Sequence, residues 1–169
     1  MIRPIVKYGD PVLVHPATVV KEVTPKIHTL IDNMIDTMYA APGVGLAASQ
    51  IGVAVRIFVS DPSCGRSADN LVVMINPELV EHEGVQAEHE GCLSLPGCEA
   101  TVPRPIRAIV RGLDRNGSPH EIEGRGLLAR IFQHELDHLD GSLFLDHLSG
   151  LKRELIQKRV KKLRRTGDW

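Results

Sequence analysis

The chain has 169 residues, with 20 lysines and arginines against 21 acidic residues and a formal net charge of −1. Apolar residues make up 43% and charged residues 24%, which is ordinary globular usage and excludes a disordered or fibrous protein. The length suits one domain. The apolar runs are too short for a membrane span, so we expect none. We also expect no signal peptide, because Asp10 and three prolines interrupt the opening segment.

The first predicted helix spans Thr24–Ala40, where apolar residues recur every three or four positions along one face. Thr24 is a suitable N-cap, and Pro42-Gly43 ends the helix. Two segments rich in β-branched residues, Val53–Ser60 and Leu71–Asn76, are predicted strands.

The middle of the chain continues with strands. Val80–Glu90 is more polar and indicates a half-exposed strand or a hairpin, and Thr101–Val102 and Ala108–Leu113 are further strand candidates. The turn Arg115-Asn116-Gly117 then leads into a strand at His120–Glu123.

Helical spacing returns at Gly126–Leu139, where Asp140-Gly141 supplies the stop, and Ser149 can cap a last helix that runs to Arg165. The order of helix, strands, helix, helix predicts an α+β fold. We expect mixed or antiparallel strands packed around the central helix, with one helix at the N-terminus and a basic helix at the C-terminus.

Residues 134–138 read His-Glu-Leu-Asp-His, inside the second predicted helix. Residues four apart share one face of a helix, so His134 and His138 can face one ion, with Glu135 close enough to act on a water molecule. Alone, the motif is also compatible with two ordinary histidines beside a helical acid.

A catalytic divalent ion needs a third protein ligand. Downstream of the motif only His147 and carboxylates are available, without the spaced extension of zincin proteases. Upstream, Glu90–Pro96 presents Cys92, although a free cysteine is by itself more often a small buried hydrophobe. Gly43–Gln50 combines two glycines with a neutral amide donor, and alone it favours a turn followed by a packing segment.

These three segments, GVGLAASQ, EGCLS and QHELDHLDG, occur in this order and together resemble the signature motifs of the bacterial-type peptide deformylase family. The resemblance extends through Ile5–Leu13, Ile75-Asn76-Pro77 and Val102-Pro103-Arg104. It implies an enzyme that hydrolyses the N-formyl group of the initiator formyl-methionine of new polypeptides and releases formate.

The odd number of cysteines (Cys64, Cys92 and Cys98) disfavours a disulfide framework and agrees with a cytoplasmic protein.

The resemblance also implies the metal centre. Cys92, His134 and His138 would hold one divalent ion, commonly Fe²⁺ in this family, with Zn²⁺, Ni²⁺ or Co²⁺ able to replace it. The ion would make hydroxide available near neutral pH. Glu135 would be the general base, which takes a proton from water and hands it to the departing amine.

The remaining motif residues would stabilise charge and bind substrate. Gln50, through its side-chain amide, and Leu93, through its backbone N–H, would support the developing oxyanion. The substrate backbone would pair in a strand-like manner near Gly45. Asp137 would either orient an imidazole or be a solvated helical acid. We interpret the other cysteines and histidines as structural or surface residues: Cys64, Cys98, His82, His89, His120 and His147.

Two rival classes use the same residues. A protease or aminopeptidase would use the HExxH motif but needs a downstream ligand, and a structural Cys/His₂ module would need neither Glu135 nor Gln50.

The net charge conceals an asymmetry. Lys152 to Arg165 contains eight basic residues and one acid, whereas the rest of the chain has 12 basic and 20 acidic residues. We expect residues 1–148 to form the metal-dependent catalytic domain and residues 149–169 to extend it as a basic helix and tail. That helix is either a solvated amphipathic helix or, since the family acts on chains emerging from the ribosome, an element that docks on ribosomal RNA.

Overall fold

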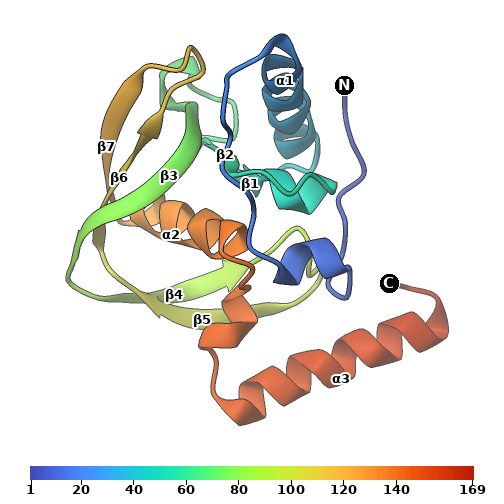
Figure 1. The fold of residues 1–169 in the computed structure, drawn as a ribbon. Coiled ribbons are helices and arrows are strands. Elements are labelled where there is room, and N and C mark those ends of the chain that lie inside the picture. Colours follow the sequence, from blue (N-terminus) through green and yellow to red (C-terminus); the bar gives the residue numbers. More distant parts are fainter.

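The computed structural model describes all 169 residues, in which three α-helices and four short 3₁₀ helices accompany seven strands (Figure 1). The α-helices are α1 (Pro25–Ala40), α2 (Leu127–Leu139) and α3 (Gly150–Thr166), and the 3₁₀ helices are η1 (Pro11–Val14), η2 (Ala48–Ile51), η3 (Ala68–Asn70) and η4 (Phe144–His147). The strands are β1 (Gly45–Ala47), β2 (Ile57–Ser60), β3 (Val72–Glu83), β4 (Gln86–Gly91), β5 (Glu99–Arg104), β6 (Arg107–Leu113) and β7 (Pro119–Arg125).

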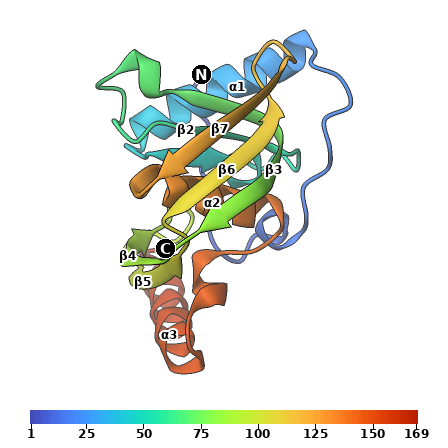
Figure 2. The same ribbon diagram turned by 90° about the vertical axis from the view of Figure 1, so that its left-hand side faces the viewer.

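The strands form two antiparallel sheets. Five of them make a sheet in the order β1-β2-β3-β6-β7, and β4 pairs with β5 in a separate two-stranded sheet. Helix α2 packs on the five-stranded sheet and lies between it and the β4–β5 pair (Figures 1 and 2). This central position of α2 confirms the predicted α+β architecture, and it places the HExxH helix where both sheets reach it.

The predicted first helix is confirmed together with its cap. Thr24 accepts a hydrogen bond from the Ile27 N–H at 3.4 Å. The apolar stripe of α1 is buried at Ile31, Met34 and Met38, in a core cluster shared with β1 and β2. A second cluster joins α2 to the sheet, with Phe132 of the helix 5.8 Å from Phe58 between ring centroids.

Two strand predictions are corrected. The strand predicted at Val53–Ser60 begins only at Ile57. The residues before it follow the η2 turn, and Ala54 and Arg56 hydrogen-bond to the backbone of Thr18 in the N-terminal segment. The hairpin alternative for Val80–Glu90 is wrong, because β3 pairs with β6 whereas β4 pairs with β5. The chain therefore leaves one sheet and enters the other at this point.

Helix α3 packs on the domain through its apolar side. Ile156 and Val160 are buried in a cluster that includes Leu95 and Phe144. At its far end, Arg164 donates to the Tyr8 carbonyl, and its guanidinium lies 5.8 Å from the centroid of the Trp169 ring. None of the three α-helices is long and apolar enough to cross a membrane.

Candidate active site

The structure brings the three predicted metal ligands together. His134 and His138 project from the same face of α2, and Cys92 follows directly after β4. The Cys92 Sγ lies 3.3 Å from the His138 Nε2, which is itself 3.3 Å from the His134 Nε2. The three ligand atoms all lie within 4.8 Å of one another, and no other His, Cys, Asp or Glu joins the group.

This donor set fits a divalent ion. Ligand atoms around a tetrahedral ion at ordinary metal–nitrogen and metal–sulfur bond lengths lie roughly 3.3 to 3.6 Å apart, close to the separations seen here. One thiolate and two imidazoles suit iron, zinc, cobalt and nickel alike. Three protein ligands leave one position for water, as catalytic sites require.

A buried carboxylate holds His134 in place. Glu90, on β4, accepts a hydrogen bond from the His134 Nδ1 at 2.5 Å, which leaves the Nε2 of that ring to face the other ligands. Arg104, on β5, donates to both oxygens of Glu90 at 2.6 and 3.0 Å. Burial alone would raise the pKa of Glu90, but its bonds to His134 and Arg104 outweigh burial and lower this pKa to about 2.

Asp137 does not orient a ligand imidazole directly. Its carboxylate accepts from Arg104 at 2.8 Å and from the His147 Nε2 at 2.8 Å, so it touches neither ligand imidazole. Its side chain is only 22% exposed, which also contradicts a freely solvated acid. His147 is half-exposed and stands outside the ligand group, as predicted.

Glu135 is buried at the cavity wall, next in sequence to His134. Its side chain is 3% exposed, and its Oε2 has no hydrogen-bond partner. Burial raises the pKa of Glu135 to about 7, so its carboxylate is poised to exchange a proton near neutral pH. Gly45 makes room for this carboxylate, because a Cβ at that position would collide with the Glu135 Oε1.

The predicted residues surround one open cavity of about 670 Å³. Its lining includes Gly45, Gln50, Cys92, Leu93, His134 and Glu135, while His138 lies buried beneath it. The Gln50 Oε1 accepts from the Ala47 N–H at 3.0 Å, which turns its Nε2 toward the Ser94 Oγ at 3.2 Å and the Cys92 Sγ at 3.6 Å. The amide is therefore fixed as a donor on the metal-ligand side of the cavity.

Sequence reasoning missed Glu90 and Arg104 as functional residues. Both stand in segments that carried the family resemblance, but their spacing has no periodicity that would join them to His134. The available signal was a pair of opposite charges flanking the Cys92 segment. Of the remaining candidates, Cys98 is 3% exposed in the core and Cys64 is a free thiol in a loop, and neither belongs to the ligand group.

The α+β fold and a Cys/His₂ group beside the HExxH glutamate define a metal-dependent hydrolase. The polypeptide deformylase family model matches residues 2–154. The peptide deformylase of Acidobacterium capsulatum is 48% identical over 169 residues, which is 100% of this chain and 99% of that protein. The chain therefore belongs to the peptide deformylase family.

Solved structures agree with this assignment. A peptide deformylase from Legionella pneumophila has a TM-score of 0.92 at 44% identity, covering 99% of this chain and 98% of that chain. A peptide deformylase from Ehrlichia chaffeensis, solved in complex with actinonin, has a TM-score of 0.88 at 38% identity and covers 95% of this chain and 96% of that one.

The low pKa of Glu90 predicts a pH dependence of stability. The folded pKa of about 2 lies below the ordinary 4.5, so the stabilisation is complete above pH 4.5 and is lost as pH falls toward 2. The wild-type free energy of unfolding falls as pH drops from 6 to 2, and we expect this fall to be smaller by on the order of 3 kcal/mol in Glu90→Gln. Denaturant unfolding of the metal-free protein between pH 2 and 6 measures this. An unchanged acid slope, equal to that of the exposed control Glu154→Gln, would contradict it.

Proposed function

We propose that this cavity removes the N-formyl group from the N-terminal formyl-methionine of newly made polypeptides and releases formate. The reaction is that of the peptide deformylase family, to which the chain belongs, and it is a metal-dependent amide hydrolysis. One observation carries the proposal: the buried Glu135 carboxylate, with an oxygen that has no partner, faces the same cavity as the metal-ligating Cys92 and His134.

Cys92, His134 and His138 would hold the ion, and we propose Fe²⁺ as the native metal, with Zn²⁺, Ni²⁺ and Co²⁺ able to replace it. When bound, the ion supplies Lewis acidity, which lowers the pKa of a water and polarises the formyl carbonyl. Glu90 supports this role, because its hydrogen bond to the Nδ1 fixes the ring orientation of His134.

Glu135 moves the proton. With a pKa of about 7, its carboxylate is ionised in about half of the molecules at neutral pH and can then accept the proton of the attacking water. The amine that leaves when the C–N bond breaks needs a proton, and the carboxyl group formed in the first step supplies it. Because Glu135 is buried, this proton is not exchanged freely with bulk water between the two steps.

Gln50 and Leu93 act on the oxyanion. Attack on the formyl carbon places negative charge on its oxygen, and a neutral amide donor stabilises that charge without adding a repelling one. The hydrogen bond from the Ala47 N–H to Gln50 fixes this donor before substrate arrives. The backbone N–H of Leu93, next to Cys92 in the same cavity wall, is the second donor in this proposal.

The substrate backbone would bind along β1. This strand is an edge of the five-stranded sheet, so its outer side is free to pair with an extended peptide near Gly45. The methionine side chain would then enter the apolar part of the cavity, which includes Val44, Leu127 and Ile131. We also propose that actinonin, bound by the Ehrlichia chaffeensis protein, occupies this cavity here.

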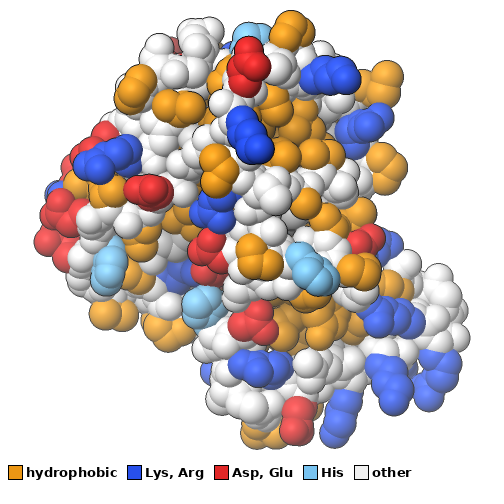
Figure 3. Space-filling model, viewed as in Figure 1, with side chains coloured by type: hydrophobic (Ala, Val, Ile, Leu, Met, Phe, Trp, Pro, Cys, Tyr) orange, Lys and Arg blue, Asp and Glu red, His pale blue; other side chains and the backbone are white.

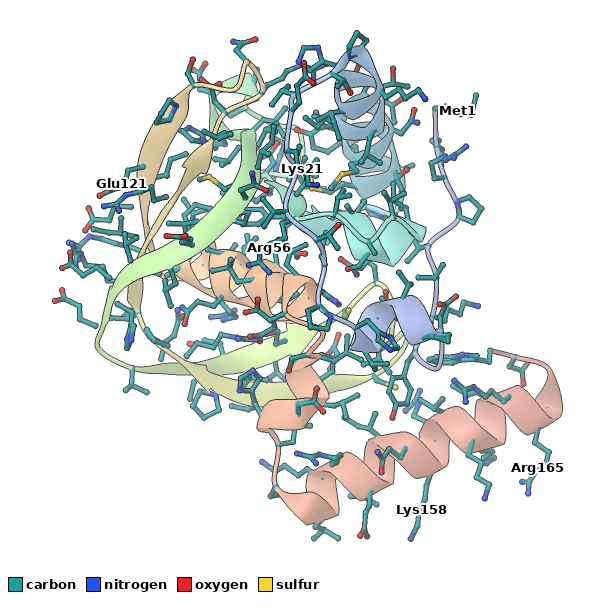
Figure 4. The ribbon with its side chains drawn as sticks, in the orientation of Figure 1. Met1, Lys21, Arg56, Glu121, Lys158 and Arg165 are labelled. Carbon is teal, nitrogen blue, oxygen red and sulfur yellow. The ribbon has the colours of Figure 1, made fainter.

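Helix α3 is proposed to contact ribosomal RNA in the cytoplasm, where new chains emerge. Arg153 and Arg164 already bond to backbone carbonyls of the domain, so they belong to its internal packing. The other six basic residues of α3 are exposed and form no ion pair: Lys152, Lys158, Arg159, Lys161, Lys162 and Arg165. Basic side chains line this edge in Figure 3, and Lys158 and Arg165 point away from the domain in Figure 4.

We further propose that residues 149–169 remain part of the same folding unit as residues 1–148. Ile156 and Val160 cover the cluster around Leu95, so removal of the helix would expose that cluster. Charge reversal therefore tests docking more cleanly than truncation does.

The substrate distinguishes this function from its rivals. We expect formate release from formyl-Met-Ala-Ser and no cleavage of Met-Ala-Ser with a free amine. Release of free methionine from the second peptide would indicate an aminopeptidase. Inactivity on both by protein with a full complement of metal would indicate a structural metal module.

Glu135→Gln should keep the metal and lose nearly all hydrolysis, at least about a hundred-fold in kcat, because geometry survives while proton transfer does not. Cys92→Ala should lose metal as well as activity. Metal analysis and formate release on the same samples separate the two roles. A fully active Glu135→Gln variant, or a normal metal content in Cys92→Ala, would overturn the assignment concerned.

The proposed iron predicts sensitivity to air. Oxidation of Fe²⁺ and of the Cys92 thiolate should make activity fade during aerobic storage, whereas protein reloaded with Ni²⁺ should persist. Undiminished activity of the natively loaded protein after long exposure to air would contradict Fe²⁺ as the native metal.

Reversing the charge at Lys158, Lys161 and Lys162 to Glu should abolish co-sedimentation with ribosomes while hydrolysis of formyl-Met-Ala-Ser is unchanged. Wild-type binding should weaken steeply with salt, because each phosphate contact releases counterions. A control that reverses two exposed lysines outside α3, Lys21→Glu with Lys26→Glu, should bind like wild type. Equal loss in the control, or salt-independent binding, would return α3 to a purely structural role.

A further inference from the structure

The short helix η4 lies against the metal-ligating residue His134. Phe144, at its start, is 1% exposed and stacks on the His134 ring, with 6.3 Å between centroids and 23° between planes. His147, at its end, is half-exposed and reaches the same imidazole by a different route. One turn of chain thus contacts His134 directly through Phe144 and indirectly through His147.

The indirect route is an unbroken series of hydrogen bonds. The His147 Nε2 donates to the Asp137 Oδ2 at 2.8 Å, and the same oxygen accepts from the Arg104 Nη1 at 2.8 Å. Arg104 donates in turn to Glu90 at 2.6 and 3.0 Å, and Glu90 accepts from the His134 Nδ1 at 2.5 Å. Because the carboxylates only accept, the direction of every bond in the series is fixed.

Helix α3 holds η4 from the other side. Arg153 donates to the Leu145 carbonyl at 3.2 Å and to the Asp146 carbonyl at 2.9 Å. Ile156 and Val160 pack in the same cluster as Phe144. The position of η4 is therefore set by the body of the domain and by α3 together.

We propose that η4 is a positioning element for the metal ligand His134, and that His147 is a positioning residue for metal retention. The inference rests on the proposed metal centre. Without His147, the Asp137 carboxylate, already 22% exposed, is free to turn toward solvent. The Arg104 Nη1 would then lose a buried partner, and Arg104 would hold Glu90 less rigidly. A looser Glu90 in turn holds the His134 ring less firmly.

The test uses full-length protein loaded with Co²⁺, and it compares His147→Ala with His147→Gln. The Gln amide can donate from nearly the position of the imidazole Nε2, so it should restore the bond to Asp137. The readouts are the rate of metal loss to a chelator and the visible spectrum of bound Co²⁺, with thermal unfolding measured on the same samples. The control is His28→Ala, which removes a histidine bond to the distant Arg115 carbonyl.

We expect His147→Ala to release metal about three- to ten-fold faster and to shift the Co²⁺ spectrum, a smaller effect than loss of a partner bonded directly to a ligand, which is about 10- to 100-fold. His147→Gln should have a rate of metal loss and a Co²⁺ spectrum close to those of the wild-type protein, and His28→Ala should match the wild-type protein in both. Wild-type release and spectrum in His147→Ala would overturn the positioning role, as would equal changes in the Ala and Gln variants. Failure of the wild-type chain to bind Co²⁺ would instead overturn the metal centre itself.

Discussion

The carboxylate of Glu90 is the contact on which the rest of the site depends. It is buried, and it is shared between Arg104 on the neighbouring strand and the Nδ1 of His134 on the central helix. One group thereby joins the β4–β5 sheet to α2 and orients a metal ligand. The pairing with Arg104 is what makes a buried negative charge tolerable at this position, and it keeps the charge available to the histidine. Cys92 comes two residues after Glu90, directly after the same strand, and His134 and His138 stand on α2. The elements that this carboxylate connects therefore carry all three predicted ligands.

The surroundings of Glu90 and Glu135 give these two buried carboxyl groups very different pKa values. Glu90 has strong partners, which hold its pKa near 2, whereas Glu135 is buried beside the cavity with an oxygen that has no partner and a pKa raised to about 7. Glu90 therefore stays charged at neutral pH and has a structural role, whereas Glu135 can gain and lose a proton there. Gly45 contributes to the surroundings of Glu135, because its missing side chain leaves the space that the Glu135 carboxylate occupies. The glycine expected to admit substrate is thus also required by the proposed general base.

Much of the molecule could be predicted from residue patterns, and the failures have identifiable causes. The helices α1, α2 and α3 can be predicted from apolar spacing and from the residues at their ends. A helix that buries one face has apolar residues every three or four positions, and this period is visible in the sequence. No local pattern predicts strand β1, since its three residues, Gly-Leu-Ala, include no β-branched side chain and owe their conformation to pairing with β2. The roles of Glu90 and Arg104 cannot be predicted from the sequence for a related reason. They depend on a tertiary contact with α2, and no local sequence pattern indicates such a contact. The same applies to helix α3. Its number of basic residues does not indicate that two of them, Arg153 and Arg164, hydrogen-bond to the rest of the domain.

The central claim is that one ion, held by Cys92, His134 and His138, makes this cavity a deformylase. The most direct measurement titrates metal-depleted full-length protein with Fe²⁺ under anaerobic conditions while formate release from formyl-Met-Ala-Ser is followed. The account predicts that activity rises from a negligible value to a plateau at one equivalent of Fe²⁺ per chain. Full activity before any metal is added, or a plateau reached only at two equivalents, would contradict it.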